Sequence, residues 1–374
     1  MKTILVTGSN GFIGRNLIQT LSRKKEEYKI VTFTKNNSLE DLKSALKECD
    51  FVYHLAAVNR TKDEKDFETV NVGLTKTIVD ILISMNKKVK ILMTSSVQVF
   101  SDTPYGKSKK AAEDILQNYN DKMRSGVYIY RLPNVFGKWS RPEYNSVVAT
   151  FCYNISHEKD IWISDENKAL ELVYIDDVVK EFTRILEVAK DSEVKFPDVR
   201  PTFKITLGKL AKMIKDFHEN RKHNIVPDFS DDFVRRLYPT YLSYLDKNDL
   251  SRSLELKTDE RGSLFELIKS EQFGQIFVST TKPNKMRGNH YHDSKIEKFC
   301  LIKGKAIIKL RNLLTNESVS YSVSDQKIEI VDIPPGYTHS IQNVGDDEMI
   351  VLFWSDEMFD PQRPDTYFER VENE

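Results

Sequence analysis

The sequence predicts an α/β protein in which a doubly wound parallel sheet is followed by a smaller, all-β domain. In the first two thirds of the chain, apolar runs alternate with helical stretches, which is the βαβ rhythm of a parallel sheet. From Gln275 onward, short β-rich runs follow one another without helical periodicity, a pattern typical of a small barrel or sandwich.

Bulk properties agree with a two-domain cytoplasmic protein. A length of 374 residues suffices for about two domains, each with its own core. Lys plus Arg equals Asp plus Glu, 56 against 56, which argues against nucleic acid or an anionic membrane surface as a partner. Cys49, Cys152 and Cys300 are widely spaced and form no CxxC pair, so we expect reduced thiols. No apolar run is long enough to span a bilayer.

The chain opens on a strand, a glycine-rich turn and a helix. The stretch KTILVTGSNGFIGRNLIQTLSRK begins with a short apolar run, passes through Gly8, Gly11 and Gly14, and continues with apolar residues at helical spacing. Without side chains the backbone can approach a pyrophosphate, and the helix N-terminus offers unpaired N–H groups to it. We therefore expect these three glycines to bind a dinucleotide cofactor.

Four further apolar runs extend the sheet and indicate which cofactor it binds. They are KIVTF, CDFVYHLAAV, VKILMTSS and VYIYRLPNVFG, and they place the cofactor at the carboxyl edge of a Rossmann sheet. NAD-selective sheets carry an acidic residue at the end of the second strand, but here that strand ends in TFTKNN. The ammonium of Lys35 suits a 2′-phosphate, so we expect NADPH. The alternative is that Lys35 is a solvated surface lysine.

The stretch TSSVQVFSDTPYGKSKKAAED contains a candidate acid–base group. Tyr105 and Lys109 are one helical turn apart, so both can point into one cleft. A nearby ammonium stabilises a phenolate and lowers the pKa of the tyrosine, which makes it usable for proton transfer to a carbonyl oxygen. The hydroxyl of Ser96 is placed to hold that oxygen.

Residues 1 to about 245 resemble the extended short-chain dehydrogenase/reductase family of nucleotide-sugar enzymes, because seven motifs occur in the family's order: TGSNGFIG, HLAAVNR, NVGLT, SSVQVF, YGKSK, RLPNVFG and YIDDVV. The resemblance implies that Tyr105 is the proton donor and that Ser96 positions the substrate oxygen. It implies that Lys109 binds the nicotinamide ribose and tunes Tyr105, and that Asn134 lies near the sugar nucleotide. Only eight residues separate Ser96 from Tyr105, so a loop that normally frames the cofactor and sugar is missing.

Two helical stretches complete the first domain. ITLGKLAKMIKDF places four large apolar residues on one helical face, and DFVRRLYPTYLSYL predicts a helix that Pro239 kinks or interrupts. A polar and charged stretch follows them. We therefore expect a reductase domain over residues 1–245, a linker over 246–255 and a second domain over 256–374.

The stretch GNHYHDSKIEKFCLIKG carries the side chains of a candidate metal site. His290 and His292 are two residues apart, so in a strand they point to the same face. Glu297, and His339 in PPGYTHSIQN, supply two more ligands. Three imidazoles and one carboxylate suit zinc, or otherwise nickel, iron or manganese. The alternative is that the histidines are satisfied by hydrogen bonds inside a barrel core.

The histidine motifs resemble those of the cupin family, which implies an all-β cupin barrel. HxHxxxxExxxxxxG fits residues 290–304 and PxGxxHxxxN fits residues 334–343, although the first glycine of each motif is absent.

A second likeness concerns the nucleotide-sugar epimerases of the cupin superfamily, which TDERGSLFEL and MRGNHYH resemble. It implies that Arg261 and Arg287 bind phosphate and that His290 is a base. His290 cannot accept a proton while its available nitrogen holds a metal, and we favour the metal role because all four ligand positions are filled. The base stays open among Tyr291, Tyr337 and metal-bound water.

The whole chain resembles a family of capsular polysaccharide and O-antigen enzymes in which a reductase is fused to a metal cupin. The resemblance implies a homodimer that acts on a UDP-4-keto-6-deoxy-HexNAc, with C3 epimerisation by the cupin and NADPH reduction at C4. The product would be UDP-2-acetamido-2,6-dideoxy-L-talose, a precursor of UDP-N-acetyl-L-fucosamine. Two alternatives remain: a single-activity reductase whose zinc cupin only stabilises or dimerises the protein, and a non-catalytic nucleotide-sensing or scaffolding subunit.

Overall fold

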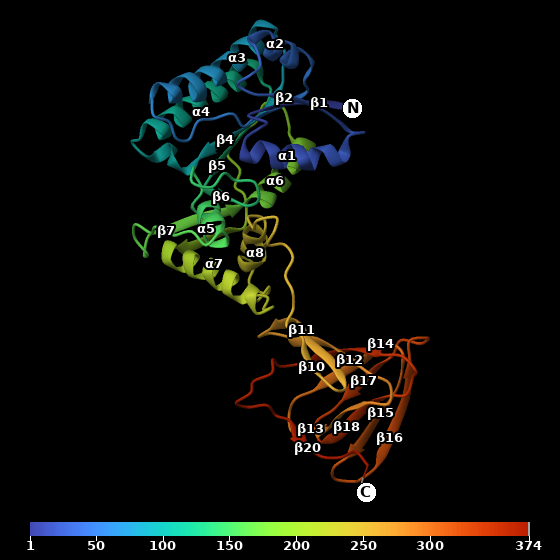
Figure 1. The fold of residues 1–374 in the computed structure, drawn as a ribbon. Coiled ribbons are helices and arrows are strands. Elements are labelled where there is room, and N and C mark those ends of the chain that lie inside the picture. The colour runs from blue at the N-terminus through green and yellow to red at the C-terminus, as the bar shows by residue number, and fades with distance from the viewer. Residues whose placement is uncertain (373–374) are drawn as a thin grey trace. The chain divides into compact units, whose positions relative to one another are not determined.

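The computed structural model describes residues 1–372, which form two compact units (Figure 1). The first unit comprises Met1–Lys215 and Arg236–Asp246, and the second comprises Asp216–Arg235 and the chain from Lys247 onward. Buried apolar side chains form separate core clusters in the two units.

A six-stranded parallel sheet forms the centre of the first unit, as the alternating pattern predicts. In spatial order its strands are β2 (Tyr28–Phe33), β1 (Lys2–Thr7), β3 (Phe51–His54), β4 (Lys90–Ser96), β5 (Val127–Leu132) and β8 (Val194–Lys195). β2 and β3 lie on opposite sides of β1, so the loop after β1 lies where the strand order reverses. Ligands bind at this switch point in doubly wound sheets.

Helices cover both faces of this sheet (Figure 1). One face is covered by α2 (Leu39–Glu48), α3 (Leu74–Ser84) and α4 (Pro104–Met123), and the other by α1 (Phe12–Leu21) and α6 (Ile175–Val188). On β1, the side chain of Leu5 packs into the core on one face of the sheet, while the side chains of Ile4 and Val6 pack into the core on the other face. This alternation is expected for a strand that is buried on both faces, and it confirms the predicted doubly wound architecture.

A smaller sheet and three further helices follow along the chain. The sheet has the order β6 (Asn134–Phe136), β7 (Ala169–Tyr174) and β9 (Thr202–Thr206), and the helices are α5 (Val147–Ser156), α7 (Leu207–Lys222) and α8 (Val234–Leu242). The single run VYIYRLPNVFG divides into β5 and β6, because Pro133 has no N–H with which to continue a ladder. Pro239 lies inside α8, so the proline does not interrupt that helix.

The second unit contains two antiparallel sheets, in agreement with the β-rich pattern of the last third. The larger sheet has the order β10 (Lys257–Asp259), β11 (Gly262–Ser270), β12 (Gly274–Thr281), β19 (Met349–Ser355), β14 (Glu297–Lys303) and β17 (Ile330–Ile333). The smaller sheet has the order β16 (Ser318–Ser324), β15 (Lys305–Asn312), β18 (Tyr337–Asn343), β13 (Met286–Tyr291) and β20 (Tyr367–Phe368). Both sheets contribute to one core, for example Phe299 and Phe353 from the larger and Ile308 and Ile341 from the smaller.

The expectation that the β-rich region begins at Gln275 was wrong, because β10 and β11 precede that residue. All three residues of β10 are exposed, so no apolar alternation identifies it in the sequence. Its pairing with β11 defines it instead. Lys269 of β11 also exchanges backbone hydrogen bonds of 2.8 and 2.9 Å with Asn224 and Val226, which joins the Asp216–Arg235 segment to the second unit.

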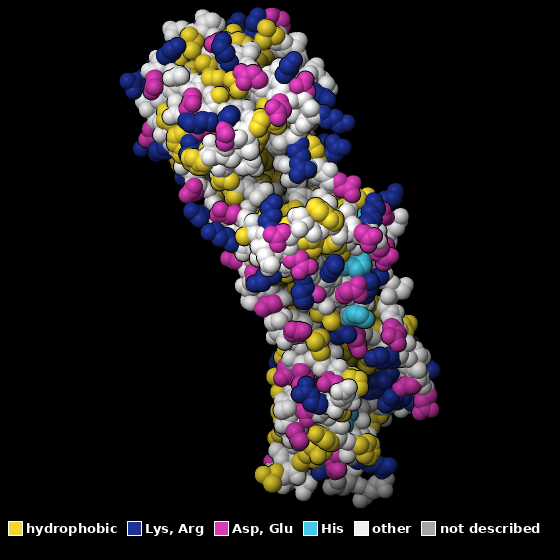
Figure 2. Space-filling view, turned by 90° about the vertical axis from the view of Figure 1, so that its left-hand side faces the viewer, with side chains coloured by type: hydrophobic (Ala, Val, Ile, Leu, Met, Phe, Trp, Pro, Cys, Tyr) yellow, Lys and Arg dark blue, Asp and Glu magenta, His cyan; other side chains and the backbone are white. Residues whose placement is uncertain are grey.

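The surface carries both signs of charge. On the face shown in Figure 2, Lys and Arg side chains are interspersed with Asp and Glu side chains, so neither sign forms a continuous field there. Among residues 1–372, no helix has the length and apolar character needed to cross a membrane.

Candidate functional site

A cavity of about 1110 Å³ lies at the carboxyl edge of the parallel sheet. Its wall includes residues that follow β1 and β3 and residues at the ends of β4 and β5, which is where doubly wound sheets bind ligands. Most residues predicted for the reductase site lie on this wall: Gly8, Gly11, Gly14, Ser96, Tyr105, Lys109 and Asn134.

The glycine loop has a shape that side chains would obstruct. A Cβ atom on Gly14 would lie 2.4 Å from the carbonyl oxygen of Gly8, and a Cβ atom on Gly8, whose φ is +67°, would lie 2.7 Å from Ala56. Gly11 caps α1 without a side-chain hydrogen bond, so the first N–H groups of the helix are available to a phosphate. This cradle fits the pyrophosphate of a dinucleotide.

Close packing of two segments brings Tyr105 to Ser96. A short 3-10 helix, η3 (Val97–Phe100), begins directly after Ser96, whose hydroxyl accepts a hydrogen bond of 3.2 Å from the Gln98 N–H. The first turn of α4 lies so near η3 that a Cβ atom on Gly106 would be 2.3 Å from the carbonyl oxygen of Gln98. The short connection between Ser96 and Tyr105 therefore still places both side chains on the wall of the same cavity, where the Ser96 hydroxyl acts to lower the pKa of Tyr105.

The electrostatics of Tyr105 differ from the sequence-based expectation. Burial raises the pKa of Tyr105 above its ordinary value, although the hydrogen bond with Ser96 opposes this. Burial also lowers the pKa of Lys109 to about 8, against the opposing influence of Glu113. The expected lowering of the Tyr105 pKa by Lys109 is wrong for this structure, because desolvation of the phenol dominates. Tyr105 is therefore protonated at neutral pH, the form in which a phenol donates a proton.

A buried ion pair that no sequence motif indicated lies beside this site. Glu113 lies one helical turn beyond Lys109 and is fully buried. Its carboxylate accepts hydrogen bonds from Ser95 Oγ at 2.6 Å and from Arg131 Nε and Nη2 at 3.0 and 2.7 Å. The network joins α4 to β4 and β5. The sequence feature that could have indicated this ion pair is a glutamate four residues after Lys109, one turn further along the predicted helix.

Two other predicted residues are exposed. Asn134 lies on β6 beside the cavity, and its Nδ2 donates to the carbonyl oxygen of Glu171 at 3.3 Å. Lys35 lies in the turn after β2 and is not among the residues that line the cavity. Its role therefore stays a prediction, with the surface-lysine alternative still open.

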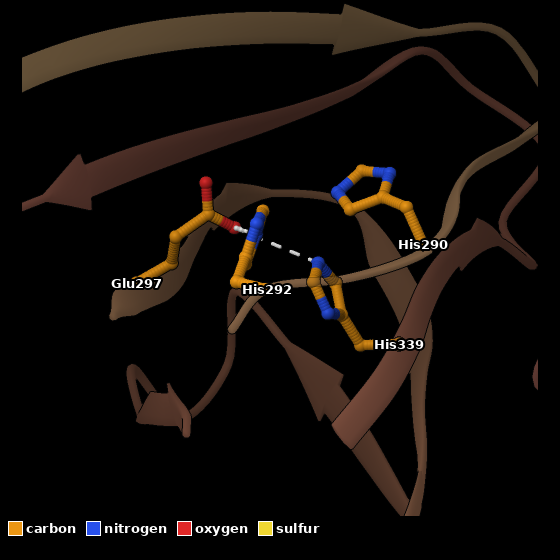
Figure 3. Close-up of side chains that lie close together, drawn as sticks. All are labelled: His290, His292, Glu297 and His339. Atoms are coloured by element: carbon orange, nitrogen blue, oxygen red, sulfur yellow. Dashed lines mark ion pairs between the residues drawn. The ribbon is translucent and has the colours of Figure 1, made fainter. Parts of the chain in front are cut away.

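The four predicted metal ligands meet in the second unit (Figure 3). One potential ligand atom each from His290, His292, Glu297 and His339 lies within 4.8 Å of the others. His290 pairs with His339 across β13 and β18, where a register shift after Gly288 re-aims the strand. Glu297 begins β14, so its carboxylate reaches the histidines from the opposite sheet.

Two buried nitrogen atoms of this cluster lack the hydrogen-bond partners that buried polar groups need. His292 and His339 are almost completely buried, and among residues 1–372 neither of their Nε2 atoms has a hydrogen-bond partner. Glu297 Oε2 lies 3.4 Å from one of these atoms and 3.5 Å from the other. The alternative of histidines satisfied by hydrogen bonds in a core therefore does not fit these two nitrogens.

The charges of the cluster suit a divalent cation. Burial alone would raise the pKa of Glu297, but hydrogens on the Nε2 atoms of His292 and His339 would hold it below its ordinary range, and a bound cation would take the place of these hydrogens. Burial, with a smaller effect from His339, lowers the pKa of His290 to about 4, so this imidazole is uncharged at neutral pH. An ionised carboxylate beside imidazole nitrogens with free lone pairs is a suitable donor set for zinc or a similar ion.

Arg261 and Arg287 converge on the carboxylate of Asp259, which was not among the predicted site residues. Arg261 Nε donates to Asp259 at 2.9 Å, and Arg287 Nη2 lies 3.8 Å from the same carboxylate. The guanidinium of Arg261 lowers the pKa of Asp259 to about 2. The two arginines are close enough to share one anion, and Asp259 would compete with a phosphate for them.

The two tyrosines considered as bases have different surroundings. The ring of Tyr291 on β13 packs against that of Tyr367 with centroids 5.2 Å apart. Tyr337 on β18 packs against the core of the second unit. These contacts do not distinguish between them, so the base stays open.

Two family models match the chain. The NAD dependent epimerase/dehydratase family matches residues 4–196, and the polysaccharide biosynthesis C-terminal domain matches residues 257–367. The first match covers just over half of the chain and includes the glycine loop and the Ser96–Lys109 segment. The second includes the four clustered side chains of the second unit.

Similarity to two other proteins extends over nearly the whole chain. The chain is 42% identical over 364 residues to the UDP-2-acetamido-2,6-beta-L-arabino-hexul-4-ose reductase of Pseudomonas aeruginosa, with 97% of each protein covered. A crystal structure of the capsular polysaccharide assembling protein CapF from Staphylococcus aureus is 43% identical and superposes with a TM-score of 0.91, covering 98% of this chain and 100% of that one. The chain shares only its fold with UDP-glucuronic acid 4-epimerase from Bacillus cereus. That structure is 22% identical, with a TM-score of 0.51, and the match covers 58% of this chain and 84% of that one.

Proposed function

This chain belongs to the NAD dependent epimerase/dehydratase family, and from that premise we propose that it is a bifunctional nucleotide-sugar enzyme of capsular polysaccharide or O-antigen synthesis. A cupin domain, residues 256–374, epimerises C3 of a UDP-4-keto-6-deoxy-HexNAc. A reductase domain, residues 1–245, then reduces the C4 ketone with NADPH to UDP-2-acetamido-2,6-dideoxy-L-talose. The observation that carries the proposal is the meeting of Ser96, Tyr105 and Lys109 with the glycine loop on one cavity, in a chain so similar to a reductase of a 4-keto UDP-sugar.

In the proposed reduction, the C4 carbonyl oxygen lies against the hydroxyls of Ser96 and Tyr105. NADPH, when bound, supplies the hydride that adds to C4. Tyr105 donates its phenolic proton to the oxygen as negative charge develops there, and Ser96 stabilises that charge with a hydrogen bond. Lys109, which lies on the wall of the same cavity, would contact the ribose of the cofactor.

In the proposed epimerisation, the C4 ketone acidifies the hydrogen on C3 because its removal produces an enolate. A base in the second unit removes this proton, and reprotonation on the opposite face inverts the centre. Tyr291 and Tyr337 are the candidate bases among the side chains of this chain. Arg261 and Arg287 would hold the pyrophosphate of the nucleotide sugar, in competition with Asp259. Reduction at C4 afterwards removes the acidity of C3, so the new configuration is kept.

The metal site assists this step. We propose that His290, His292, Glu297 and His339 hold a divalent cation, with zinc as the first choice. When bound, the cation supplies positive charge that stabilises an oxyanion such as an enolate. The orphaned Nε2 atoms of His292 and His339 support this assignment.

Isotope exchange tests the proposal directly. When the zinc-loaded full-length protein is incubated in D₂O with the UDP-4-keto-6-deoxy sugar and without NADPH, we expect the C3 proton signal to disappear from the NMR spectrum, because the enolate forms before any hydride transfer. An unchanged signal with folded, metal-loaded protein would contradict an epimerase. It would leave a reductase whose cupin domain is a stabilising or dimerising module.

The cofactor preference has its own test at Lys35. We expect Lys35→Ala to raise the KM for NADPH about 10- to 100-fold and to leave the KM for NADH unchanged, because a charge-assisted hydrogen bond to the 2′-phosphate contributes about 1.5–3 kcal/mol. Steady-state kinetics with each cofactor measures this effect. Lys25→Ala, another exposed lysine of the first unit, is the matched control. An unchanged KM for NADPH would support the surface-lysine alternative.

A further inference from the structure

The last described residues of the chain run along the strands that carry the histidine cluster. Residues 364–371, here called the C-terminal strap, include β20, which pairs with β13 so that Phe368 lies opposite His290. The N–H of Glu369 donates to the carbonyl oxygen of Asn289 at 2.9 Å. The hydroxyl of Thr338, the neighbour of His339, donates to the carbonyl oxygen of Glu369. The strap therefore contacts β13 and β18, the strands that carry His290 and His339.

Asp365 anchors the strap to the loop between His292 and Glu297. Its carboxylate accepts backbone hydrogen bonds from the three loop residues Asp293, Ser294 and Lys295, at 2.9, 3.0 and 2.8 Å. The φ of Asp365 is +39°, a left-handed conformation that aspartate tolerates better than most residues. The anchor thus holds the short loop that separates two of the clustered side chains.

The backbone of the same residue orients an imidazole of the cluster. Nδ1 of His292 lies 2.6 Å from the carbonyl oxygen of Asp365, and because a carbonyl only accepts, the hydrogen of the neutral ring is on Nδ1. Nε2 then carries the free lone pair, and this is the nitrogen that lies 3.4 Å from Glu297 without a hydrogen-bond partner. The contact therefore selects the tautomer that binds a cation and fixes the direction of its lone pair.

We propose that Asp365 is a positioning residue for the metal site and that docking of the C-terminal strap and metal occupancy are thermodynamically linked. The carboxylate holds the loop, the carbonyl holds His292, and the rest of the strap holds the strands of His290 and His339. A cation that draws the four side chains together favours the docked strap, and the docked strap raises the affinity for the cation. The inference rests on the metal site of the proposed function and extends it to a segment outside the ligand motifs.

Metal affinity tests the role of Asp365. In the full-length, chelator-stripped protein, we expect Asp365→Gly to weaken zinc binding about 10- to 100-fold, the loss typical of an outer-shell partner of a ligand. Glycine keeps the left-handed backbone free of strain, so the change isolates the carboxylate. Asp360→Gly is the control, because among the described residues that carboxylate bonds Gln362 and Arg363 of its own segment and none of the residues that hold the strap. Titration of zinc against a chromophoric chelator measures affinity, and the visible spectrum of bound cobalt reports the geometry of the ligands.

The linkage has a second test that needs no variant. Zinc should slow hydrogen exchange of the strap amides of Glu369 and Val371 in the wild-type protein, since both bond to Asn289 on the histidine-bearing strand. Suppose that the wild-type protein binds zinc. The inference is then overturned, and the proposed function stands, if Asp365→Gly has the wild-type zinc affinity and cobalt spectrum. The same conclusion follows if zinc leaves the hydrogen exchange of the strap amides unchanged. If the wild-type protein binds no zinc, the metal site itself fails and the inference fails with it.

Discussion

Replacing Tyr105 with phenylalanine should lower kcat for ketone reduction by about 10²- to 10⁴-fold, because it removes only the proton that the carbonyl oxygen receives. The ring should keep its place, since Tyr105 packs against Phe67 with centroids 5.9 Å apart and this contact does not involve the hydroxyl. KM for the sugar nucleotide should change little. The rate of NADPH oxidation with the UDP-4-keto sugar measures the effect.

A matched control is Tyr119→Phe on the same helix. Its hydroxyl bonds the N–H and carbonyl oxygen of Val89, far along the helix from Tyr105, and takes no part in the proposed reaction. That variant should lose stability by about 1 kcal/mol and keep its kcat. Deuterium exchange at C3 should persist in Tyr105→Phe, because the proposed epimerisation occurs in the second unit. A Tyr105→Phe protein that reduces the ketone at the wild-type rate would show that another group is the donor.

The second large effect is expected at Glu297. Glu297→Gln removes the single negative charge of the cluster and leaves the orphaned imidazole nitrogens without a carboxylate. We expect zinc affinity to fall by more than about 100-fold, beyond the usual loss for an outer-shell partner, and C3 exchange to be abolished. Metal content after dialysis and the NMR exchange assay measure the two effects.

Chelation and metal restoration separate this effect from damage to the fold. Stripping the wild-type protein should abolish C3 exchange, and adding zinc back should restore it in the wild type but not in Glu297→Gln. Glu329→Gln, which loses only an exposed ion pair with Lys327, is the control and should behave as the wild type. Exchange that continues at full rate in stripped protein would assign the metal a structural role.

The sequence was most informative where chemistry requires neighbours along the chain. The spacing of the glycines and apolar residues was sufficient to predict a glycine turn between a strand and a helix. The spacing of Tyr105 and Lys109 was sufficient to place them one turn apart on another helix. Both sets now lie on one cavity wall. The HxH pattern likewise predicted that both imidazoles point to the same side; His290 lies on β13, His292 directly follows that strand, and both are members of one cluster. These inferences succeed because helix and strand periodicities are local properties.

Long-range contacts were not accessible in the same way. The pairing of Glu113 with Arg131 depends on the order in which β4 and β5 lie beside α4. The raised pKa of Tyr105 depends on how completely neighbouring elements exclude water from the phenol, which no spacing with Lys109 predicts. Strand β10 was missed because it is defined by its partner rather than by its own residues.

By itself, the sequence determined the order of the chain, an α/β region followed by an all-β region, the glycine turn after the first strand, and the four side chains that cluster in the second unit. Only the tertiary structure decided that the C-terminal strap reaches this cluster, with Asp365 contacting His292 across 73 positions of sequence. The physical reason is that the types of the candidate ligand residues, and their short spacing along the chain, can be read directly from the sequence. The tautomer, lone-pair direction and protonation of the same residues are set by desolvation and by partners that only folding brings near.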